Sequence, residues 1–469
     1  MYQHLIKLYR AIRFCWRTFV GIIKKTINKF MYKSILMCAA LGLCSVMPGV
    51  AGRNVQPSGR FVTVDNGRFM RDGKPYYYVG ANLWYGAILG SEGEGGNRKR
   101  LCCELDSLCA VGVNNLRVLV GSDGKRGVPA KVEPTLQVEP GVYNDTIFAG
   151  LDYLLAEMGK RGMTAVLYLN NSWEWSGGYG QYLEWAGCGR APVPAVDGWA
   201  AYNAYVSRFV KSGMAKALYA KYVKDVITRT NRYTGVRYAD DPTIMSWQIG
   251  NEPRAFGEDN KEAFAEWIES AAAFIDSLAP NQLVSTGSEG KHGCEEDLAL
   301  FERIHAGGHV DYANIHIWPY NWGWAAADSL AAGAAKAMGL TKEYIDEHLA
   351  VARRIGKPLV LEEFGYPRDG FKFDKAAGTT GRDAYYAYVF GLVLGSARTG
   401  GQLAGCNFWA WGGSAVLPVG HMYWQPGDDY TGDPAQEQQG LNSVFCSDRS
   451  TLALIRSAND SLRGACGWR

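Results

Sequence analysis

The chain has 469 residues, of which 47% are hydrophobic and 20% are charged, a composition that excludes a largely disordered protein. The formal net charge is +3, but residues 1–52 hold eight basic residues and no acidic one, so the remaining 41 basic and 46 acidic residues give a net charge of −5. A weakly acidic body offers no electrostatic basis for binding nucleic acid, and we expect no such partner.

The first 52 residues are typical of a targeting segment. From Met31, a lysine, an apolar stretch and small residues follow in the order found in a secretory signal peptide, with cleavage expected near Ala51. We divide the chain into a basic extension plus signal peptide at 1–52, whose true start could be Met31, and a body at 53–469. The protein is expected to be secreted, periplasmic or at the cell surface. A lipid anchor on Cys44 is the less favoured alternative, because leucine precedes that cysteine.

Two apolar stretches of the body end in a glutamate in the same way. Residues 241–256 begin with Asp-Pro, continue as an apolar run and then deliver Glu252. Residues 356–368 begin with Gly-Lys-Pro, continue as Leu-Val-Leu and then deliver Glu363. Short continuous apolar runs are typical of strands covered on both faces of a parallel sheet. Two carboxyl groups at the same end of such a sheet are the minimum needed to hydrolyse a glycosidic bond, one protonated and the other ionised.

Strands and helices alternate along the whole body. Strands are expected at 77–84, 111–120, 163–171, 241–256, 281–290, 311–320, 356–368 and 403–413, and helices at 98–110, 147–161, 205–234, 260–279, 341–355 and 382–399. Eight strands with intervening helices predict a single (β/α)8 TIM barrel with enlarged loops, preceded by a short β-hairpin at 61–80. A doubly wound sheet is the alternative, but it would need a dinucleotide fingerprint that the sequence lacks.

Polar side chains and tryptophans follow the expected strands at the end where active sites of this scaffold lie. They include Asn82, Trp84, Arg117, Asn170, Asn171, Trp173, Asn251, Glu252, His316, Trp318, Glu363, Trp409 and Trp411. Arg117 lies within a buried strand and needs an anion; Glu363 would be held ionised by this contact, and a purely structural acid is the alternative partner. His316 could be a core histidine or could orient the substrate or the acid/base.

Other residue types give weaker signals. The 15 Trp and 27 Tyr residues suit a sugar-binding groove, although about half of those in loops could merely pack the loops. His305 and His309 have the spacing of a metal pair on a helix, but two glycines between them argue against a helix and we expect no metal. Eight of the 11 cysteines follow the signal peptide, which suits one or two disulfide bonds whose pairing stays open.

From about residue 60 to residue 466 the body resembles glycoside hydrolase family 5, and within it the endo-β-1,4-mannanases. The resemblance rests on GNEPR at 250–254, IHIWP at 315–319, EEFG at 362–365 and FWAWG at 408–412, in that order. Two features are more similar to mannanases than to cellulases: Arg254 directly after Asn-Glu-Pro, and the late loop at 432–445.

The resemblance implies that Glu252 is the general acid/base and Glu363 the nucleophile. Strand alternation agrees with this choice, because Glu363 is expected to share a face with Leu361 while Glu362 points the other way. The resemblance also implies that Asn251 binds the 2-hydroxyl of the sugar at the cleavage subsite.

The same resemblance implies a wider substrate-binding set. Trp409 or Trp411 would form the floor of the cleavage subsite, and Arg117 and His316 would surround the carboxylates. The family usually has tyrosine where this chain has Trp318, so a hydroxyl that bonds the nucleophile would be missing and Trp318 would stack on sugar. Trp84, Asn171, Trp173 and Arg254 complete the expected set.

The expected function is a secreted, retaining endo-β-1,4-mannanase that cleaves internal bonds of mannan, glucomannan or galactomannan. No metal, organic cofactor or obligate protein partner is implied, and we expect a monomer. The alternatives are a β-1,4-glucanase or an exo-β-mannosidase on the same scaffold, and a non-catalytic glycan-binding protein. Retention predicts that the two carboxyl groups lie about 5 Å apart.

Overall fold

The central feature of the computed structural model, which describes residues 61–468, is one sheet of eight parallel strands. Its order is β10, β9, β8, β5, β4, β13, β12, β11. The bounds are β4 Tyr78–Asn82, β5 Asn115–Leu119, β8 Thr164–Tyr168, β9 Ile244–Gln248, β10 Leu283–Ser285, β11 Ala313–Ile317, β12 Leu359–Phe364 and β13 Leu403–Phe408. The Asp311 N–H donates to the carbonyl oxygen of Val284 at 2.8 Å, which links the two outermost strands. The sheet is therefore nearly closed, and the predicted TIM barrel is confirmed.

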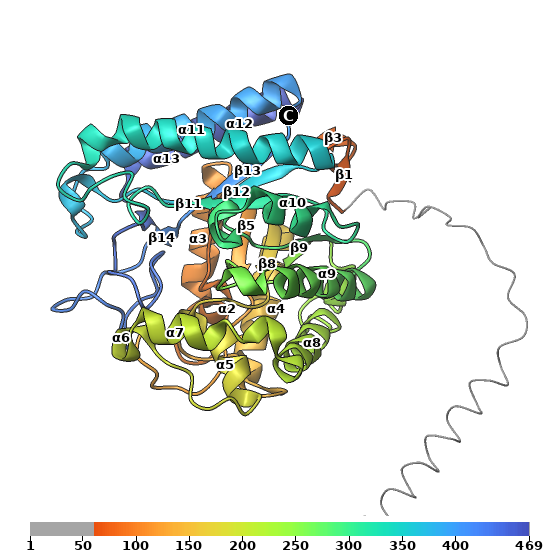
Figure 1. Ribbon diagram of the computed structural model, residues 1–469. Coiled ribbons are helices and arrows are strands. Elements are labelled where there is room, and N and C mark those ends of the chain that lie inside the picture. Colours follow the sequence, from red (N-terminus) through yellow and green to blue (C-terminus); the bar gives the residue numbers. More distant parts are fainter. Residues whose placement is uncertain (1–60, 469) are drawn as a thin grey trace, which may run out of the picture. The chain divides into compact units, whose positions relative to one another are not determined.

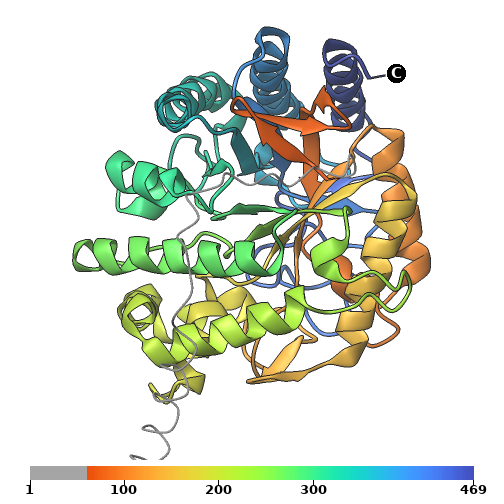
Figure 2. The ribbon, with the colours of Figure 1, turned by 90° about the vertical axis from the view of Figure 1, so that its right-hand side faces the viewer.

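Helices surround this sheet (Figures 1 and 2). The longer ones are α3 Arg98–Ala110, α4 Asp145–Lys160, α8 Gly213–Ile227, α9 Lys261–Leu278, α10 Leu298–Ala306, α11 Leu330–Ile355, α12 Thr380–Thr399 and α13 Arg449–Ala465. Shorter ones lie in the loops: α2 Gly86–Leu89, α5 Gly178–Trp185, α6 Pro194–Asp197 and α7 Trp199–Val206, with 3-10 turns η1 Glu174–Ser176, η2 Phe209–Lys211, η3 Tyr238–Asp240, η4 Glu258–Asn260, η5 Lys291–Cys294 and η6 Asp369–Phe371. Among residues 61–468 no helix combines the length and apolar character needed to cross a membrane.

Two of the expected helices have the wrong bounds. The single helix expected at 205–234 is wrong: α7 ends at Val206, and α8 begins at Gly213 after Ser212 caps it by accepting from the Ala215 N–H at 3.2 Å. The helix expected at 341–355 begins earlier, at Leu330. The sequence interpretation also missed α10, which lies between β10 and β11, and α13, which follows β13.

The N-terminal hairpin is instead a three-stranded antiparallel sheet of β1 Thr63–Asp65, β2 Arg68–Arg71 and β3 Lys74–Pro75. The reason is that Asn66 and Asp72 each adopt positive φ before a glycine, so the segment makes two tight turns. Side chains of this segment pack with residues that point into the barrel. The shared cluster contains Val62, Phe69, Tyr76, Tyr78, Val166, Met245, Leu283, Tyr312, Val360 and Ala404. This end of the barrel is therefore covered (Figure 2), and the opposite end carries the loops.

Strand β12 carries an extra residue where the two adjacent glutamates stand. Two consecutive residues of β11 pair with Leu361 and Glu363, so Glu362 is the additional residue of a bulge. Val360 packs inside the barrel and Leu361 in the cluster that includes the helices, so simple alternation would direct Glu363 outward. The bulge returns Glu363 to the interior, where both glutamates contact Arg117. The alternation argument from sequence is therefore wrong, although the residue it selected does face the barrel axis.

Long loops follow β8 and β13 at the open end of the barrel (Figure 1). The first contains η1 and α5 to α7. The second runs from β14 Trp411–Gly413 to β15 Val444–Phe445, and these two short strands pair with each other. Both loops are long enough to supply side chains to the barrel mouth. The expectations for residues 1–52 lie outside the described residues.

Candidate active site

The backbone after β9 turns sharply at Glu252. Its φ of 49° is in the left-handed region, which costs a non-glycine residue about 1–3 kcal/mol. Two contacts with neighbouring strand ends hold this conformation: the Glu252 N–H donates to the carbonyl oxygen of Gly287 at 2.9 Å, and the Ser172 hydroxyl donates to the carbonyl oxygen of Glu252. The turn places the Glu252 side chain at the mouth of the barrel, where it is 7% exposed.

Glu363 stands at the end of β12, 3% exposed, and forms an ion pair with Arg117 from β5. Arg117 is fully buried and also donates to Gln248 Oε1 at 2.8 Å and to Asn251 Oδ1 at 2.7 Å. Glu363, the partner predicted for Arg117 from sequence, is thus one of its two carboxylate partners; the other is Glu362, at 3.9 Å from Nε. Asn251 in turn donates to Asn171 Oδ1 at 3.3 Å, so Asn171 acts on the site by orienting Asn251.

One imidazole lies between the two carboxyl groups. Nδ1 of His316 is 2.8 Å from Glu252 Oε1 and 3.4 Å from Glu363 Oε2. One side-chain atom from each of these three residues lies within 4.8 Å of the other two. The carboxyl group that follows β9 and the carboxyl group of β12 therefore lie close together. Burial lowers the pKa of His316 well below its ordinary value, with a further contribution from Arg117, so the ring is neutral.

The two carboxyl groups influence each other's ionisation. Burial raises the pKa of Glu252 and of Glu363, and the charge of Glu252 raises the pKa of Glu363 further. Arg117 opposes the effect of burial on both groups, but of these two carboxyl groups it forms an ion pair with Glu363 and not with Glu252 among the described residues. We therefore place the charge on Glu363 and the proton on Glu252.

Glu252 is also surrounded by indole and guanidinium groups. The Trp173 indole N–H donates to Glu252 Oε2, and the indole of Trp318 lies near the same carboxyl group. The Arg254 guanidinium lies 5.0 Å from the Trp173 ring centre and donates from Nε to Glu289 Oε2 at 2.6 Å. Burial raises the pKa of Glu289 to about 7, although Arg254 lowers it. Arg254 thus interacts with both acids: it forms an ion pair with Glu289 and lowers the pKa of Glu252.

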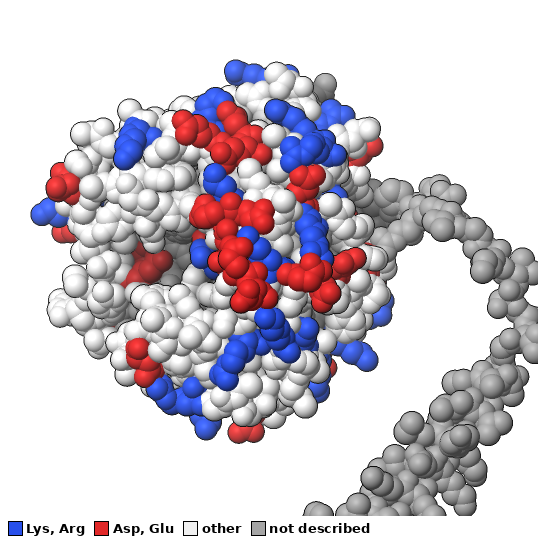
Figure 3. Space-filling view, viewed as in Figure 1, with Lys and Arg blue, Asp and Glu red and all other residues white. Residues whose placement is uncertain are grey.

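These groups border a cavity of about 490 Å³. It is lined by Trp173, Glu174, Trp175, Trp199, Asn203, Asn251, Glu252, Arg254, Glu289, Trp318, Asn321, Trp322, Glu363, Trp409, Gln436 and Glu437. Figure 3 shows the surface hollowed near the position of β14 in Figure 1, with acidic side chains inside the hollow. Burial, together with Asp433 and Glu252, raises the pKa of Glu437 to about 8.

The structure brings most of the predicted site residues to this cavity. The lining includes Trp173, Asn251, Glu252, Arg254, Trp318, Glu363 and Trp409. Arg117, Asn171 and His316 lie directly behind it and contact lining residues through hydrogen bonds or ion pairs.

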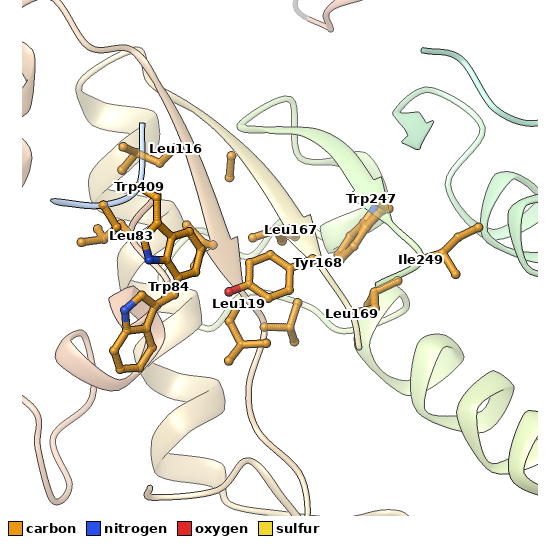
Figure 4. Close-up of a cluster of buried hydrophobic side chains, with 14 of the residues drawn as sticks. Leu83, Trp84, Leu116, Leu119, Leu167, Tyr168, Leu169, Trp247, Ile249 and Trp409 are labelled. Atoms are coloured by element: carbon orange, nitrogen blue, oxygen red, sulfur yellow. The ribbon is translucent and has the colours of Figure 1, made fainter. Parts of the chain in front are cut away.

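The expectation that Trp84 and Trp411 bind sugar is wrong, because neither side chain lines the cavity. Trp84 is 3% exposed, its indole N–H donates to the carbonyl oxygen of Gly432 at 2.9 Å, and Figure 4 shows it in the packed cluster that also includes Trp409 and Tyr168. Trp411 is fully buried, and its indole N–H donates to Glu104 Oε2 at 2.7 Å. Both side chains stabilise the loops around the mouth and neither lines the cavity.

Sequence reasoning missed several cavity residues. They are Glu174, Trp199, Asn203, Glu289, Asn321, Gln436 and Glu437. Most of them come from loops or loop helices, so only the aromatic character of the loops pointed to them. Glu289 is the exception: it lies near the end of the strand expected at 281–290, and its position after β10 could have identified it. The two histidines with metal-like spacing do not converge: His305 contacts Thr286, and His309 contacts Asp276. The eight cysteines from Cys102 to Cys466 are free thiols, so the expected disulfide bonds do not form in the described part of the chain.

Comparison with known proteins agrees with this geometry. The sequence model of the family described as GH family 5 beta-mannosidase-like matches residues 59–466. A curated rice relative (Oryza sativa subsp. japonica), a putative mannan endo-1,4-beta-mannosidase 9, is 32% identical over 383 residues, which are 79% of this chain and 84% of that protein.

Solved structures give a second comparison. The glycoside hydrolase family 5 mannosidase from Rhizomucor miehei matches with a TM-score of 0.79 and 33% identity, covering 87% of this chain and 99% of that one. The endo-1,4-beta-D-mannanase from Thermotoga petrophila matches with a TM-score of 0.60 and 25% identity, covering 82% and 99%.

The different environments of Trp409 and Trp411 predict different responses to the same substitution. Trp411→Phe removes one donor from buried Glu104, which Arg100 and Ser414 still contact, and should lower the free energy of unfolding by about 1–3 kcal/mol. Trp409→Phe should cost less, because the indole N–H of Trp409 makes no hydrogen bond of normal geometry among residues 61–468. Urea unfolding of the two variants checks this order, and equal losses would contradict the structural role of Trp411.

Proposed function

Because the chain belongs to the GH family 5 beta-mannosidase-like family and is a glycoside hydrolase, we propose that it is a retaining endo-β-1,4-mannanase. The observation that carries this proposal is the contact of two carboxyl groups with one neutral imidazole, His316, at 2.8 and 3.4 Å. A spacing of about 5 Å between carboxyl groups suits attack by one of them on the anomeric carbon, whereas inversion needs room for a water molecule between them. The atoms of this pair lie within 4.8 Å.

Each residue then has a role that its contacts support. Glu252 donates its proton to the oxygen of the bond being cleaved, and Glu363, held ionised by Arg117, attacks the anomeric carbon to form a glycosyl–enzyme bond. Glu252, now a carboxylate, takes a proton from the water that releases the sugar with retained configuration. Asn251, oriented by Arg117 and Asn171, directs its side chain to the sugar at the cleavage point.

The mannan substrate is part of the proposal and rests on the relatives. The rice protein is named as an endo-acting mannan hydrolase and shares 32% of its residues with this chain. The cavity supplies six indole rings, and such rings stack on the apolar faces of sugars. They are those of Trp173, Trp175, Trp199, Trp318, Trp322 and Trp409. Export through a signal peptide and a monomeric state belong to the same proposal.

Glu363→Gln should lower the rate of mannan hydrolysis by roughly 10⁴-fold, because the amide cannot form the glycosyl–enzyme bond. The neighbouring substitution Glu362→Gln is the matched control. It changes the same chemical group one residue earlier, where Tyr312 and Asn314 bind the carboxylate at 3.0 and 2.6 Å, and should affect stability more than turnover. Reducing-sugar assays with thermal denaturation measure both, and an active Glu363→Gln variant would refute the assignment.

An exo-acting β-mannosidase is the second candidate. The solved mannosidase from R. miehei has a TM-score of 0.79 against 0.60 for the T. petrophila endo-mannanase. In addition, the polar side chains of Gln436 and Glu437 border the cavity and could close one end of it. We expect an endo-acting enzyme to release mannobiose and longer products from mannan at early times. Chromatography of the products over the time course checks this expectation. If mannose is the only product released, the exo-acting candidate is favoured.

The Arg254–Glu289 pair predicts a change in pH dependence. Glu289→Gln removes a negative charge near Glu252 and leaves Arg254 to act on Glu252 alone, and both effects lower the pKa of Glu252. Glu252 must be protonated to start the reaction, so the basic limb of the pH–activity profile should move to lower pH, by about 1 unit. Glu269→Gln, an exposed change on α9, should leave the profile in place. A shift to higher pH would contradict this role.

A further inference from the structure

Glu174 is a cavity carboxyl group that has no part in the chemistry and whose hydrogen-bonding capacity is only partly used. Glu174 is 9% exposed and lines the cavity, and its Oε2 is buried without a hydrogen-bond partner among residues 61–468. Leaving a buried polar atom unpaired is unfavourable, so such a group indicates a ligand that satisfies it. Burial raises the pKa of Glu174 to about 7, so near neutral pH it can accept or donate a hydrogen bond.

Helix α7 contributes two further side chains to the same cavity, both of types that commonly bind sugars. Trp199 is 53% exposed and Asn203, one helical turn later, is also exposed, and both line the cavity. Tyr202, between them in sequence, lies 6.0 Å from the Trp199 ring and interacts electrostatically with Glu174. A flat ring, an amide and a carboxyl group thus gather at one side of the cavity.

The backbone around this group is fixed in advance. The Tyr202 hydroxyl donates to the carbonyl oxygen of Ser172 at 2.6 Å and ties α7 to the loop after β8. The Val132 N–H donates to the carbonyl oxygen of Trp175 at 2.7 Å, and the Asn171 amide donates to Ser176 Oγ at 3.0 Å. A preorganised arrangement lowers the entropy cost of binding, as a built subsite requires.

From these contacts we propose that Glu174, Trp199 and Asn203 form a sugar subsite on the leaving-group side of the cleaved bond. The proposal rests on the proposed function and extends it to a specific part of the substrate. The ring of Trp199 stacks on the apolar face of a hexose, and the Glu174 carboxyl group and the Asn203 amide bind its hydroxyl groups.

The side of the cavity follows from the tryptophan between the subsite and the acid/base. The rings of Trp173 and Trp199 lie edge to face with centres 5.7 Å apart, and the indole of Trp173 donates to Glu252. Glu252 protonates the oxygen that leaves, so sugars beyond Trp173 belong to the departing part of the chain. A substrate whose departing part is only a nitrophenyl group would leave this subsite empty of sugar.

The test compares two substrates with the full chain: mannohexaose and a nitrophenyl β-mannobioside. Glu174→Gln and Trp199→Ala should each lower kcat/KM for mannohexaose about tenfold more than for the nitrophenyl substrate. Asn203→Ala, an exposed change that cannot disturb the core, should show the same selectivity to a smaller degree. Glu266→Gln, exposed on α9, is the control and should not separate the two substrates.

The outcomes distinguish failure of the proposed subsite from failure of the proposed function. Equal losses on both substrates would place the subsite on the other side of the cleaved bond or reduce its role to folding, and would overturn the inference. No loss on either substrate would also overturn it. If the wild-type chain hydrolyses neither substrate, the proposed function fails before the subsite is in question. Thermal denaturation of each variant identifies a loss that comes from unfolding.

Discussion

The barrel and its site depend on the burial of one guanidinium group. Arg117 is fully buried and donates to Asn82, Gln248 and Asn251 in addition to its ion pair with Glu363. These partners come from β4, from β9 and the turn after it, and from β12, so one side chain connects three strand ends across the barrel. A buried guanidinium that loses a partner is strongly destabilising, and this makes the register of those strands a condition for stability. The position of Glu363 is then fixed by the same contacts that keep the barrel folded.

The two adjacent glutamates divide structural and chemical roles. Glu362 accepts hydrogen bonds from Gln248, Tyr312 and Asn314 deep in the barrel, and it is not among the residues that line the cavity in the described part of the chain. Glu363 contacts only Arg117 and His316 by comparison, and part of its carboxyl group faces the cavity. The bulge in β12 permits both residues to point inward, because an extra residue shifts the alternation by one step. Glu362 thus has a structural role through its hydrogen bonds, and Glu363 is available to react with a substrate in the cavity.

Sequence could predict the elements that repeat a strong local pattern. The eight strands were found because each is a short apolar run, and the carboxylates because they end two such runs. Trp84 and Trp411 were misassigned since a tryptophan at a strand end looks the same whether it binds sugar or packs a loop. Glu174 was missed because its position depends on a loop path, for which sequence gives no periodicity. Glu289 was overlooked although it lies near the end of the strand expected at 281–290. The bulge at Glu362 was also invisible, since nothing in a run of leucine and valine marks it.

The number of acids in the cavity overstates its negative charge. Burial raises the pKa of Glu174 and of Glu289 to about 7, burial together with neighbouring acids raises that of Glu437 to about 8, and burial also raises the pKa of Glu252. Near neutral pH the cavity is therefore lined largely by groups that can donate as well as accept hydrogen bonds. Such a lining matches the hydroxyl groups of an uncharged sugar, which need both kinds of partner. A more anionic cavity would raise the pKa of Glu363 and weaken the nucleophile, so burial of the surrounding acids also serves the chemistry.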